Sequence, residues 1–378
     1  MFDFMRKRDV YKEKGNYIEI DLKNLQQNIN FLKTIIDPKT KVIAMVKSNA
    51  YGHGIVPVSS FLQKVGIDFF GVFTVREGIL LRTSRIRKDI LIFGPFQEYD
   101  LAHITKFRLT PVVGSRDEIN FLVSASKKKA VKIHIKIDTG MGRIGFLPEE
   151  GFEIISSIKR NNPSLILEGI CTHFADSSSK DPSYTVYQAS LFLQLLNRLE
   201  KENIWIPVIH ASNSAAILRF PQFQFNCVRP GILIYGIESM PYQNDLKPVM
   251  SLYSYVSILK TIPENSFISY TCSFKTNRKT LIAIVPIGYA DGYMLDLSNK
   301  AYVLIKGKRF PIIGNICMNQ FIVDITDSEG IKLNDKVTLI GKDAQEEINV
   351  NSLAKLAGKI PYEIICRLSE NIPRINLS

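Results

Sequence analysis

The sequence lacks the hydrophobic segments that direct proteins into or across membranes. Its 378 residues include no apolar run of roughly 18 or more residues, so we expect no membrane-spanning helix and no membrane partner. The first residues, MFDFMRKRDVYKEKGNYIEI, contain neither an apolar core nor a cleavage site, so a secretory signal is not expected.

Cysteine is scarce and forms no pattern. The five cysteines are odd in number, lie scattered in apolar segments and form no C-x-x-C pair. This argues against a disulfide framework and against a cysteine zinc site. A cytoplasmic location is therefore expected.

Acidic residues are fewer than basic ones, which gives a net charge of +12 and a pI near 9.3. Such a balance indicates nucleic-acid binding when the basic residues cluster on one face or along a motif. Here they are dispersed, and the densest clusters, at 82–88 and 127–129, contain no interleaved aromatic residues. We expect solvated surfaces, no nucleic-acid partner, and a positive field that steers small anions.

The sequence does contain a regular alternation of short apolar runs with segments of helical spacing, such as 183–203. Strands that alternate with helices indicate a parallel sheet with crossover helices. Eight such strands in succession match a (β/α)8 TIM-like barrel. The eight runs are 41–47, 69–75, 89–94, 109–114, 131–137, 167–174, 206–212 and 225–236.

The alternation ends near residue 250, where strand-like runs follow one another with only short turns until a helical segment at 350–358. The predicted fold is therefore α/β. It has a (β/α)8 barrel with an N-terminal extension over residues 1–245, and a mainly β C-terminal domain over 246–378. The sequence does not indicate a role for residues 1–16.

Barrel active sites form at the carboxyl ends of the strands, so the residues there are the candidate chemistry. The first strand ends at Lys47, an amine nucleophile once burial or a nearby cation lowers its pKa from about 10.4. A lysine at a strand end more often extends its amine into solvent, so Lys47 by itself does not identify a catalytic site. The other strand ends contribute Arg143, His173, His210, Ser214, Arg229 and Gly231.

The segment 140–145 contains a G-x-G-x-x-G pattern, with Glu168 downstream as the acidic residue of a dinucleotide-binding fingerprint. The context argues against that interpretation. Met141 and Arg143 would crowd a pyrophosphate, and Pro148 interrupts the required entry into a helix. We prefer a tight loop that directs Arg143 into the barrel mouth.

A metal-dependent barrel hydrolase, with Lys136, His173 and His210 around the metal, is the competing class. However, the sequence has no H-x-H or H-x-x-E ligand pair. Lysine and arginine also outnumber carboxylates at the strand ends, which repels a divalent cation and suits a phosphate. We therefore predict no metal site.

Ser214, at the start of a predicted helix, and Gly231 provide backbone amides where such barrels often bind phosphate. An ordinary helix N-cap explains Ser214 equally well. With Lys47 on the other side of the mouth, a phosphate pocket here favours pyridoxal 5′-phosphate as cofactor. In the second domain Tyr289 lies in a glycine-rich turn, where covering the β-core is the simpler interpretation.

Eight motifs occur in the order found in bacterial alanine racemases, which the chain resembles over residues 17–375. They are VKSNAYGHG, HIKIDTGMGRIGF, CTHFADS, HASNSAA, VRPGILIYG, PIGYADGY, GNICMNQ and PYEIICRLSENIPR. The resemblance implies an isomerase that uses pyridoxal 5′-phosphate to interconvert L- and D-alanine and supplies D-alanine for peptidoglycan. It also implies a homodimer in which each active site is completed by the β-domain of the other subunit.

By position in these motifs, the resemblance implies that Lys47 and Tyr289 are two bases on opposite faces of the substrate. A chain from Tyr289 through His173 to Arg229 would assist the tyrosine, and Arg229 would face the pyridine nitrogen. The implied phosphate ligands are Tyr51, Ser214, Gly231, Ile232 and Tyr362.

Substrate contacts are implied in the same way. Arg143, assisted by the Met318 amide, would bind the substrate carboxylate and the cofactor's phenolic oxygen. Lys136 occupies a position that family members can carbamylate.

Two positions depart from the family pattern: Asn319 replaces an aspartate, and Thr271 replaces a glycine. The lost carboxylate leaves substrate preference open, so a serine or broader-specificity racemase is an alternative, as is a decarboxylase that shares the barrel. Tyr362 narrows the pocket and favours alanine. The sequence does not indicate carbamylation or dimer affinity.

Overall fold

The computed structural model describes residues 15–126, 130–237 and 246–377. The basic cluster at 127–129, most of the N-terminal extension and the residues just before the predicted domain boundary lie outside these ranges. The boundary between residues 245 and 246 therefore stays a prediction.

The chain divides into two compact units. The barrel unit comprises residues 29–50 and 55–234. The β unit contains residues 51–54, the described residues up to 28 and those from 235 onward. Both ends of the described chain thus belong to the β unit.

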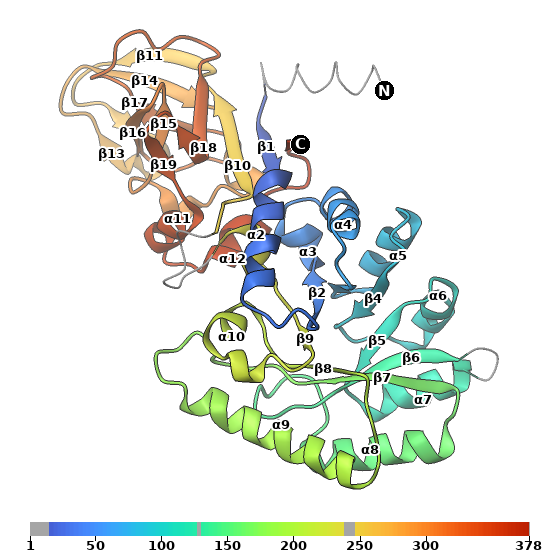
Figure 1. The fold of residues 1–378 in the computed structure, drawn as a ribbon. Helices are drawn as coiled ribbons and strands as arrows, with labels where there is room; N and C mark the ends of the chain where they lie inside the picture. The colour runs from blue at the N-terminus through green and yellow to red at the C-terminus, as the bar shows by residue number, and fades with distance from the viewer. Residues whose placement is uncertain (1–14, 127–129, 238–245, 378) are drawn as a thin grey trace. The chain divides into compact units, whose positions relative to one another are not determined.

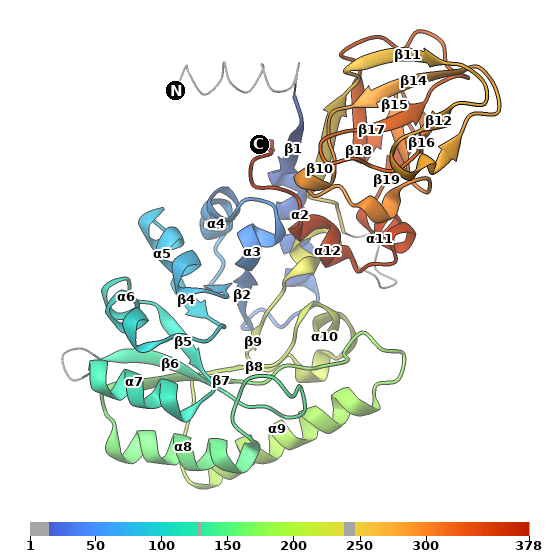
Figure 2. The same ribbon diagram turned by 180° about the vertical axis from the view of Figure 1, so that it is seen from behind.

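The barrel unit contains eight parallel strands that close into a barrel in the order β2 to β9, which confirms the predicted (β/α)8 architecture. The strands are short and mainly apolar, because one face of each fills the barrel and the other lies under a helix. Figures 1 and 2 show the helices on the outside of these strands. The strands are β2 (Lys41–Met45), β3 (Phe69–Val72), β4 (Asp89–Ile92), β5 (Thr110–Val113), β6 (Val131–Lys136), β7 (Leu165–Cys171), β8 (Val208–His210) and β9 (Cys227–Val228).

Helices follow the strands and place their apolar faces against them, which buries the barrel's outer surface. Helix α5 (Val75–Thr83) begins with a capping box: Thr74 Oγ1 accepts from Glu77 N at 3.1 Å, and Glu77 Oε2 accepts from Thr74 N at 2.9 Å. The helices are α4 (Ile55–Lys64), α5 (Val75–Thr83), α6 (Leu101–Lys106), α7 (Arg116–Ser126), α8 (Pro148–Asn161), α9 (Ser183–Lys201) and α10 (Ser214–Arg219), with α2 (Leu22–Thr34) before β2.

The β unit contains a ten-stranded sheet in the order β11-β14-β17-β16-β15-β18-β10-β1-β20, with β19 paired to β18. This confirms the predicted mainly β C-terminal domain. Its strands include β10 (Met250–Tyr255), β11 (Ile258–Ile262), β14 (Thr280–Val285), β15 (Tyr302–Ile305), β16 (Lys308–Ile313), β17 (Phe321–Asp324), β18 (Lys336–Asp343), β19 (Glu346–Ile348) and β20 (Arg374–Leu377). Helices α11 (Val350–Ala357) and α12 (Pro361–Cys366) follow β19, and a separate hairpin pairs β12 (Phe267–Ile268) with β13 (Phe274–Lys275).

The first strand of the described chain, β1 (Tyr17–Asp21), lies between the first and last strands of the C-terminal domain. It pairs antiparallel with β10 and parallel with β20. This pairing was not predicted from the sequence, because strand partners far apart in the chain leave no local pattern.

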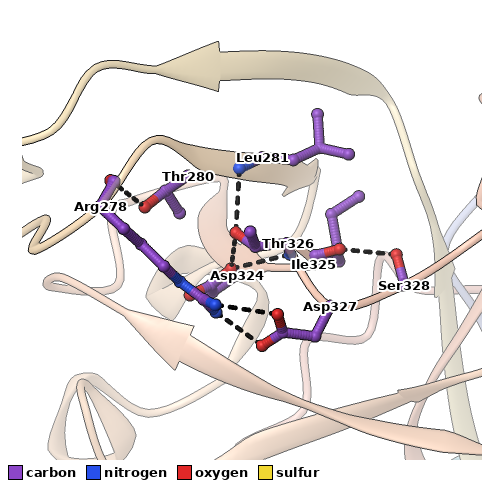
Figure 3. A network of polar contacts seen from close by, with 8 residues as sticks. All are labelled: Arg278, Thr280, Leu281, Asp324, Ile325, Thr326, Asp327 and Ser328. Atoms are coloured by element: carbon purple, nitrogen blue, oxygen red, sulfur yellow. Dashed lines mark hydrogen bonds and ion pairs between the residues drawn. The ribbon is translucent and has the colours of Figure 1, made fainter.

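A network of polar side-chain contacts connects β14 and β17 of the β unit near one end of these strands (Figure 3). Arg278 donates to both carboxylate oxygens of Asp327, at 2.9 and 2.6 Å. Thr326 Oγ1 accepts from Leu281 N at 3.0 Å and donates to Asp324 Oδ1 at 2.6 Å. These contacts join the start of β14 to the turn after β17.

None of the helices in the described ranges has both the length and the apolar character that a bilayer crossing requires.

Candidate active site

Lys47 lies two residues beyond the end of β2, where the backbone turns left-handed. Residues 48–51 all have φ between 52° and 54°. That conformation costs about 1–2 kcal/mol for each non-glycine residue, so other contacts must hold it. Three bonds within the barrel unit do so: Ser48 N donates to Glu77 Oε1 at 2.7 Å, Ile55 N to Asn49 Oδ1 at 2.8 Å, and Ala50 N to Val46 O at 2.9 Å.

The glycine-rich loop after β6 is wrapped around a carboxylate. Asp138 Oδ1 accepts from the backbone N–H groups of residues 140, 141 and 142 at 2.9, 2.7 and 3.1 Å. Asp138 Oδ2 accepts from Arg143 N at 2.9 Å. Partial burial opposes ionisation, but these bonds outweigh it and lower the pKa of Asp138.

The loop therefore folds around its own aspartate and fixes the position of Arg143. At Gly145, φ is +129° and a Cβ would lie 2.8 Å from Asp138 N, so the close turn requires glycine. The role of Asp138 was not predicted from the sequence, although an aspartate two residues before a glycine-rich run is typical of such a turn.

Arg229 follows β9 and is buried. Its Nη2 donates to the carbonyls of Thr172 and Ala211 at 2.8 and 2.7 Å, and lies 3.1 Å from His173 Nδ1. Its Nη1 lies 2.7 Å from His210 Nδ1. Because a guanidinium only donates, both facing imidazole nitrogens must be acceptors.

The imidazole of His173 lies among positive charges from several strand ends. Burial lowers its pKa well below the usual value, and Lys136, Arg229, Arg143 and Lys47 lower it further. The strand ends of β2, β6, β7 and β9 thus converge on one strongly cationic site, and His173 stays neutral within it.

Lys136, the last residue of β6, belongs to the same cluster. Burial lowers its pKa to about 8, and the positive charges of Arg229 and Arg143 act in the same direction. An appreciable share of this amine is therefore unprotonated near neutral pH.

The interpretation of Ser214 as the N-cap of α10 is wrong. The cap is Asn213, whose Oδ1 accepts from the third residue of the helix at 3.0 Å. Ser214 Oγ instead accepts from the backbone N–H groups of Gly231 and Leu233, at 2.9 and 3.2 Å. The Ser214 hydroxyl therefore meets the backbone amides of Gly231 and Leu233, the two residues that flank the buried Ile232.

In the β unit, Tyr51 packs with two other tyrosines. Its ring centroid lies 5.9 Å from that of Tyr362 and 5.2 Å from that of Tyr235. Burial, followed by the effects of Tyr362 and Cys366, raises its pKa, so its hydroxyl stays protonated and can donate. The neighbouring His53 is buried and stacks on Tyr235 at 4.4 Å.

Tyr289 opens a short 3-10 turn, η5 (Tyr289–Asp291), and its side chain is 46% exposed. Its backbone N donates to Cys317 O at 3.1 Å, and Ala290 N donates to Met318 O at 2.9 Å. The two motifs of the β unit are therefore adjacent and present Tyr289 and Met318 at the surface of that unit. Tyr289 is too exposed to serve only as a cover for the β-core.

The two departures from the family pattern are both in the β unit. Thr271 has φ +59°, a conformation that glycine adopts without strain, so a glycine fits this turn better. Asn319 is exposed. Within the described ranges, no group of three or more His, Cys, Asp or Glu side chains could hold a metal ion.

The neutral histidines predict that the protein loses stability in mild acid. The pKa values of His134, His173 and His210 are all lowered, chiefly by burial. Unfolded histidines titrate near about 6.5, so below that pH the unfolded chain binds protons that the folded chain does not. Stability is therefore lost as the pH falls through about 6.5, by up to about 4 kcal/mol per pH unit well below it.

Urea unfolding followed by circular dichroism at a series of pH values measures this effect. The midpoint concentration is expected to fall steeply below about pH 6.5. The variant His103→Gln, which removes an exposed histidine of α6, should give the same curve. A midpoint that stays constant down to about pH 5 would contradict the prediction.

Known proteins resemble this chain over almost its whole length. The family model "Alanine racemase, N-terminal domain" matches residues 20–239, and "Alanine racemase, C-terminal domain" matches residues 249–376. The chain is 42% identical over 368 residues to an alanine racemase of Methanococcus maripaludis, covering 96% of this chain and 98% of that one. It is 39% identical over 366 residues to an alanine racemase of Halothermothrix orenii, covering 96% of each.

Solved structures agree with these matches. The alanine racemase of Clostridium difficile 630 superposes with a TM-score of 0.90 at 35% identity, covering 96% of this chain and 95% of that one. The alanine racemase of Bacillus anthracis with bound L-Ala-P superposes with a TM-score of 0.90 at 33% identity, covering 97% and 95%.

Proposed function

The chain belongs to the alanine racemase family and is an isomerase that interconverts L- and D-alanine, and we propose that it does so with pyridoxal 5′-phosphate as cofactor and Lys47 and Tyr289 as bases. One observation carries the proposal. Lys47, Lys136, Arg143 and Arg229 all act on the neutral imidazole of His173, so a nucleophilic amine, anion-binding groups and a neutral imidazole share one site.

The residues of the barrel unit fit this cofactor. Lys47 would hold its aldehyde, because a lysine amine is the group that attacks a carbonyl carbon. The amides of Gly231 and Ile232, with the Ser214 hydroxyl, would hold the phosphate, since Ser214 Oγ lies 2.9 Å from Gly231 N and Ile232 is the next residue. Arg229, fixed by two backbone carbonyls, would face the pyridine nitrogen.

In the β unit, the protonated hydroxyl of Tyr51 is a donor that, together with the hydroxyl of Tyr362, would complete the phosphate site. When bound, pyridoxal 5′-phosphate withdraws electrons from the substrate's Cα–H bond and so makes that proton removable.

Two bases perform the stereochemical change. Lys47 removes or returns the Cα proton on the side from which D-alanine is formed, and Tyr289 does so on the opposite side. His173 faces Arg229 with Nδ1, so its proton lies on Nε2, and this N–H would donate to the Tyr289 oxygen and stabilise its deprotonated form. Arg143 and the Met318 amide hold the substrate carboxylate, which keeps Cα between the two bases.

Lys136 is proposed to be carbamylated. Its amine, with a pKa of about 8, adds to carbon dioxide and releases one proton, which yields an anionic carbamate. That anion would lie near Arg143 and Arg229 and would offset the repulsion between these two cations.

The proposed assembly is a homodimer in which Tyr289 and Met318 act on the active site of the other subunit. Their exposure at the surface of the β unit, 46% and 55%, supports this arrangement. The proposed role is to supply D-alanine for peptidoglycan, in the cytoplasm.

The purified enzyme tests the proposal directly. L-alanine and L-serine at equal concentration should give D-alanine much faster than D-serine, measured by chiral chromatography. The protein should carry a visible absorbance that aldehyde-trapping reagents remove. A colourless active enzyme would refute the cofactor, and faster D-serine formation would favour the broader-specificity racemase.

The Asp138 loop gives a separate prediction for Arg143. Asp138→Ala removes the acceptor of four backbone N–H groups, so the loop should loosen and Arg143 should bind the carboxylate poorly. The KM for alanine is expected to rise at least about tenfold, since bonds to a charged acceptor contribute about 1.5–3 kcal/mol each. Asp181→Ala, at an exposed turn of the same unit, is the control and should leave the KM unchanged. An unchanged KM in Asp138→Ala would show that the loop does not position Arg143.

A further inference from the structure

A buried polar chain runs from Arg229 through two imidazoles to a carboxylate. Arg229 Nη1 lies 2.7 Å from His210 Nδ1, and His210 Nε2 lies 2.8 Å from His134 Nδ1. His134 Nε2 faces Glu168 Oε2 at 3.5 Å, while Glu168 Oε1 lies 2.7 Å from Lys132 Nζ. The mechanism uses only the Arg229 end of this chain.

The protons of the chain have one consistent arrangement. Arg229 only donates, so the neutral His210 accepts at Nδ1 and carries its proton on Nε2. That N–H donates to His134 Nδ1, which leaves the proton of His134 on Nε2. Burial lowers the pKa of both imidazoles and keeps them neutral.

The carboxylate of Glu168 selects this arrangement. Burial opposes its ionisation, but His134 and Lys132 outweigh that effect and lower its pKa. An ionised carboxylate only accepts, so it requires a proton on His134 Nε2. Among the described residues, neither His134 Nε2 nor Glu168 Oε2 has a hydrogen-bond partner, and their 3.5 Å approach leaves these two atoms to each other.

The backbone of β7 departs from regular geometry at this contact. The pairing of β6 with β7 passes from Ile133 opposite Leu167 to His134 opposite Gly169, so Glu168 is the extra residue of a bulge. Bulges redirect side chains. Gly169 also admits the imidazole, because a Cβ there would lie 2.2 Å from His134 Nδ1. A bulge and a glycine both weaken a buried strand, which is a cost without benefit unless the contact matters.

We propose that Glu168 is a positioning residue that fixes the tautomers of His134 and His210 and thereby provides Arg229 with an acceptor. Glu168, the acidic residue that fitted a dinucleotide fingerprint, thus acts on Arg229 through two imidazoles. The expected change in kcat rests on the proposed role of Arg229 in racemisation. The predicted tautomers of His134 and His210 do not depend on that role.

The tautomers are measured directly by solid-state NMR of the holoenzyme with 15N-labelled histidine. The chain has only five histidines, so the signals can be assigned with single substitutions such as His103→Gln. His134 and His210 are each expected to carry the proton on Nε2 and none on Nδ1 at neutral pH. A proton on Nδ1 of either residue would overturn the proposal, whatever the activity.

Two substitutions then test Glu168 itself. Glu168→Gln keeps an acceptor and should keep both tautomers, with kcat within about threefold of the unaltered enzyme. Glu168→Leu removes the acceptor, so the tautomers should mix and kcat should fall about tenfold with KM within about twofold. Circular dichroism confirms that each variant is folded.

Unaltered tautomers in Glu168→Leu would refute the proposal. Mixed tautomers with an unaltered kcat would support the positioning role and count against the catalytic role of Arg229. If the leucine variant does not fold, the glutamine variant still decides, because loss of the Nε2 tautomers there would also refute it.

Discussion

Replacing Lys47 with alanine is expected to abolish racemisation in both directions and to remove the cofactor's visible absorbance. The loss should be at least about 10³-fold, since the variant lacks both the covalent attachment and one of the two bases. The turnover of each enantiomer is measured separately by chiral chromatography, and absorbance is recorded on the same samples.

Two further variants separate chemistry from charge. Lys47→Arg keeps the cation that acts on His173 but offers no neutral amine, so it should be as inactive as the alanine variant. Lys64→Ala removes an exposed lysine at the end of α4 and should behave as the unaltered enzyme. Activity in Lys47→Arg would mean that Lys47 serves only as a charge.

The parts of this protein that were predictable from sequence are those with a local signal. Alternating apolar runs predicted the barrel strands, and the position after each strand predicted that His173 and Arg229 would lie near one another. A strand's direction and end are properties of a few neighbouring residues, and the barrel topology then brings the ends together.

The features that were missed depend on distant partners or on a backbone that breaks the usual pattern. The pairing of β1 with β10 and β20 joins segments over 200 residues apart, about which local spacing says nothing. The left-handed run at 48–51 opposes the intrinsic preference of its residues and exists because Glu77 holds the amide of Ser48 and the side chain of Asn49 accepts from Ile55 N.

The bulge at Glu168 is a third case, because it adds one residue to a strand whose apolar pattern otherwise continues. A sequence reading that assumes strict alternation assigns Glu168 to the wrong face. The contact with His134 becomes visible only once the register of β6 and β7 is known.

The variant Tyr289→Phe is expected to separate racemisation from proton removal. Phenylalanine keeps the ring, and the turn is held by backbone bonds to Cys317 and Met318, so the fold should not change. Racemisation should fall about 10²- to 10⁴-fold in both directions, which is the usual contribution of a positioned acid or base.

The two faces of the substrate should nevertheless respond differently. Lys47 remains, so in D2O the variant should still exchange the Cα hydrogen of D-alanine without forming L-alanine, while L-alanine should exchange far more slowly. Proton NMR of each enantiomer measures this, and Tyr270→Phe, at a more exposed tyrosine of the same unit, is the matched control. Equal loss of exchange from both enantiomers would refute the assignment, because a single base serving both faces predicts no asymmetry. The asymmetry thus distinguishes a two-base enzyme from one in which Tyr289 only shapes the site.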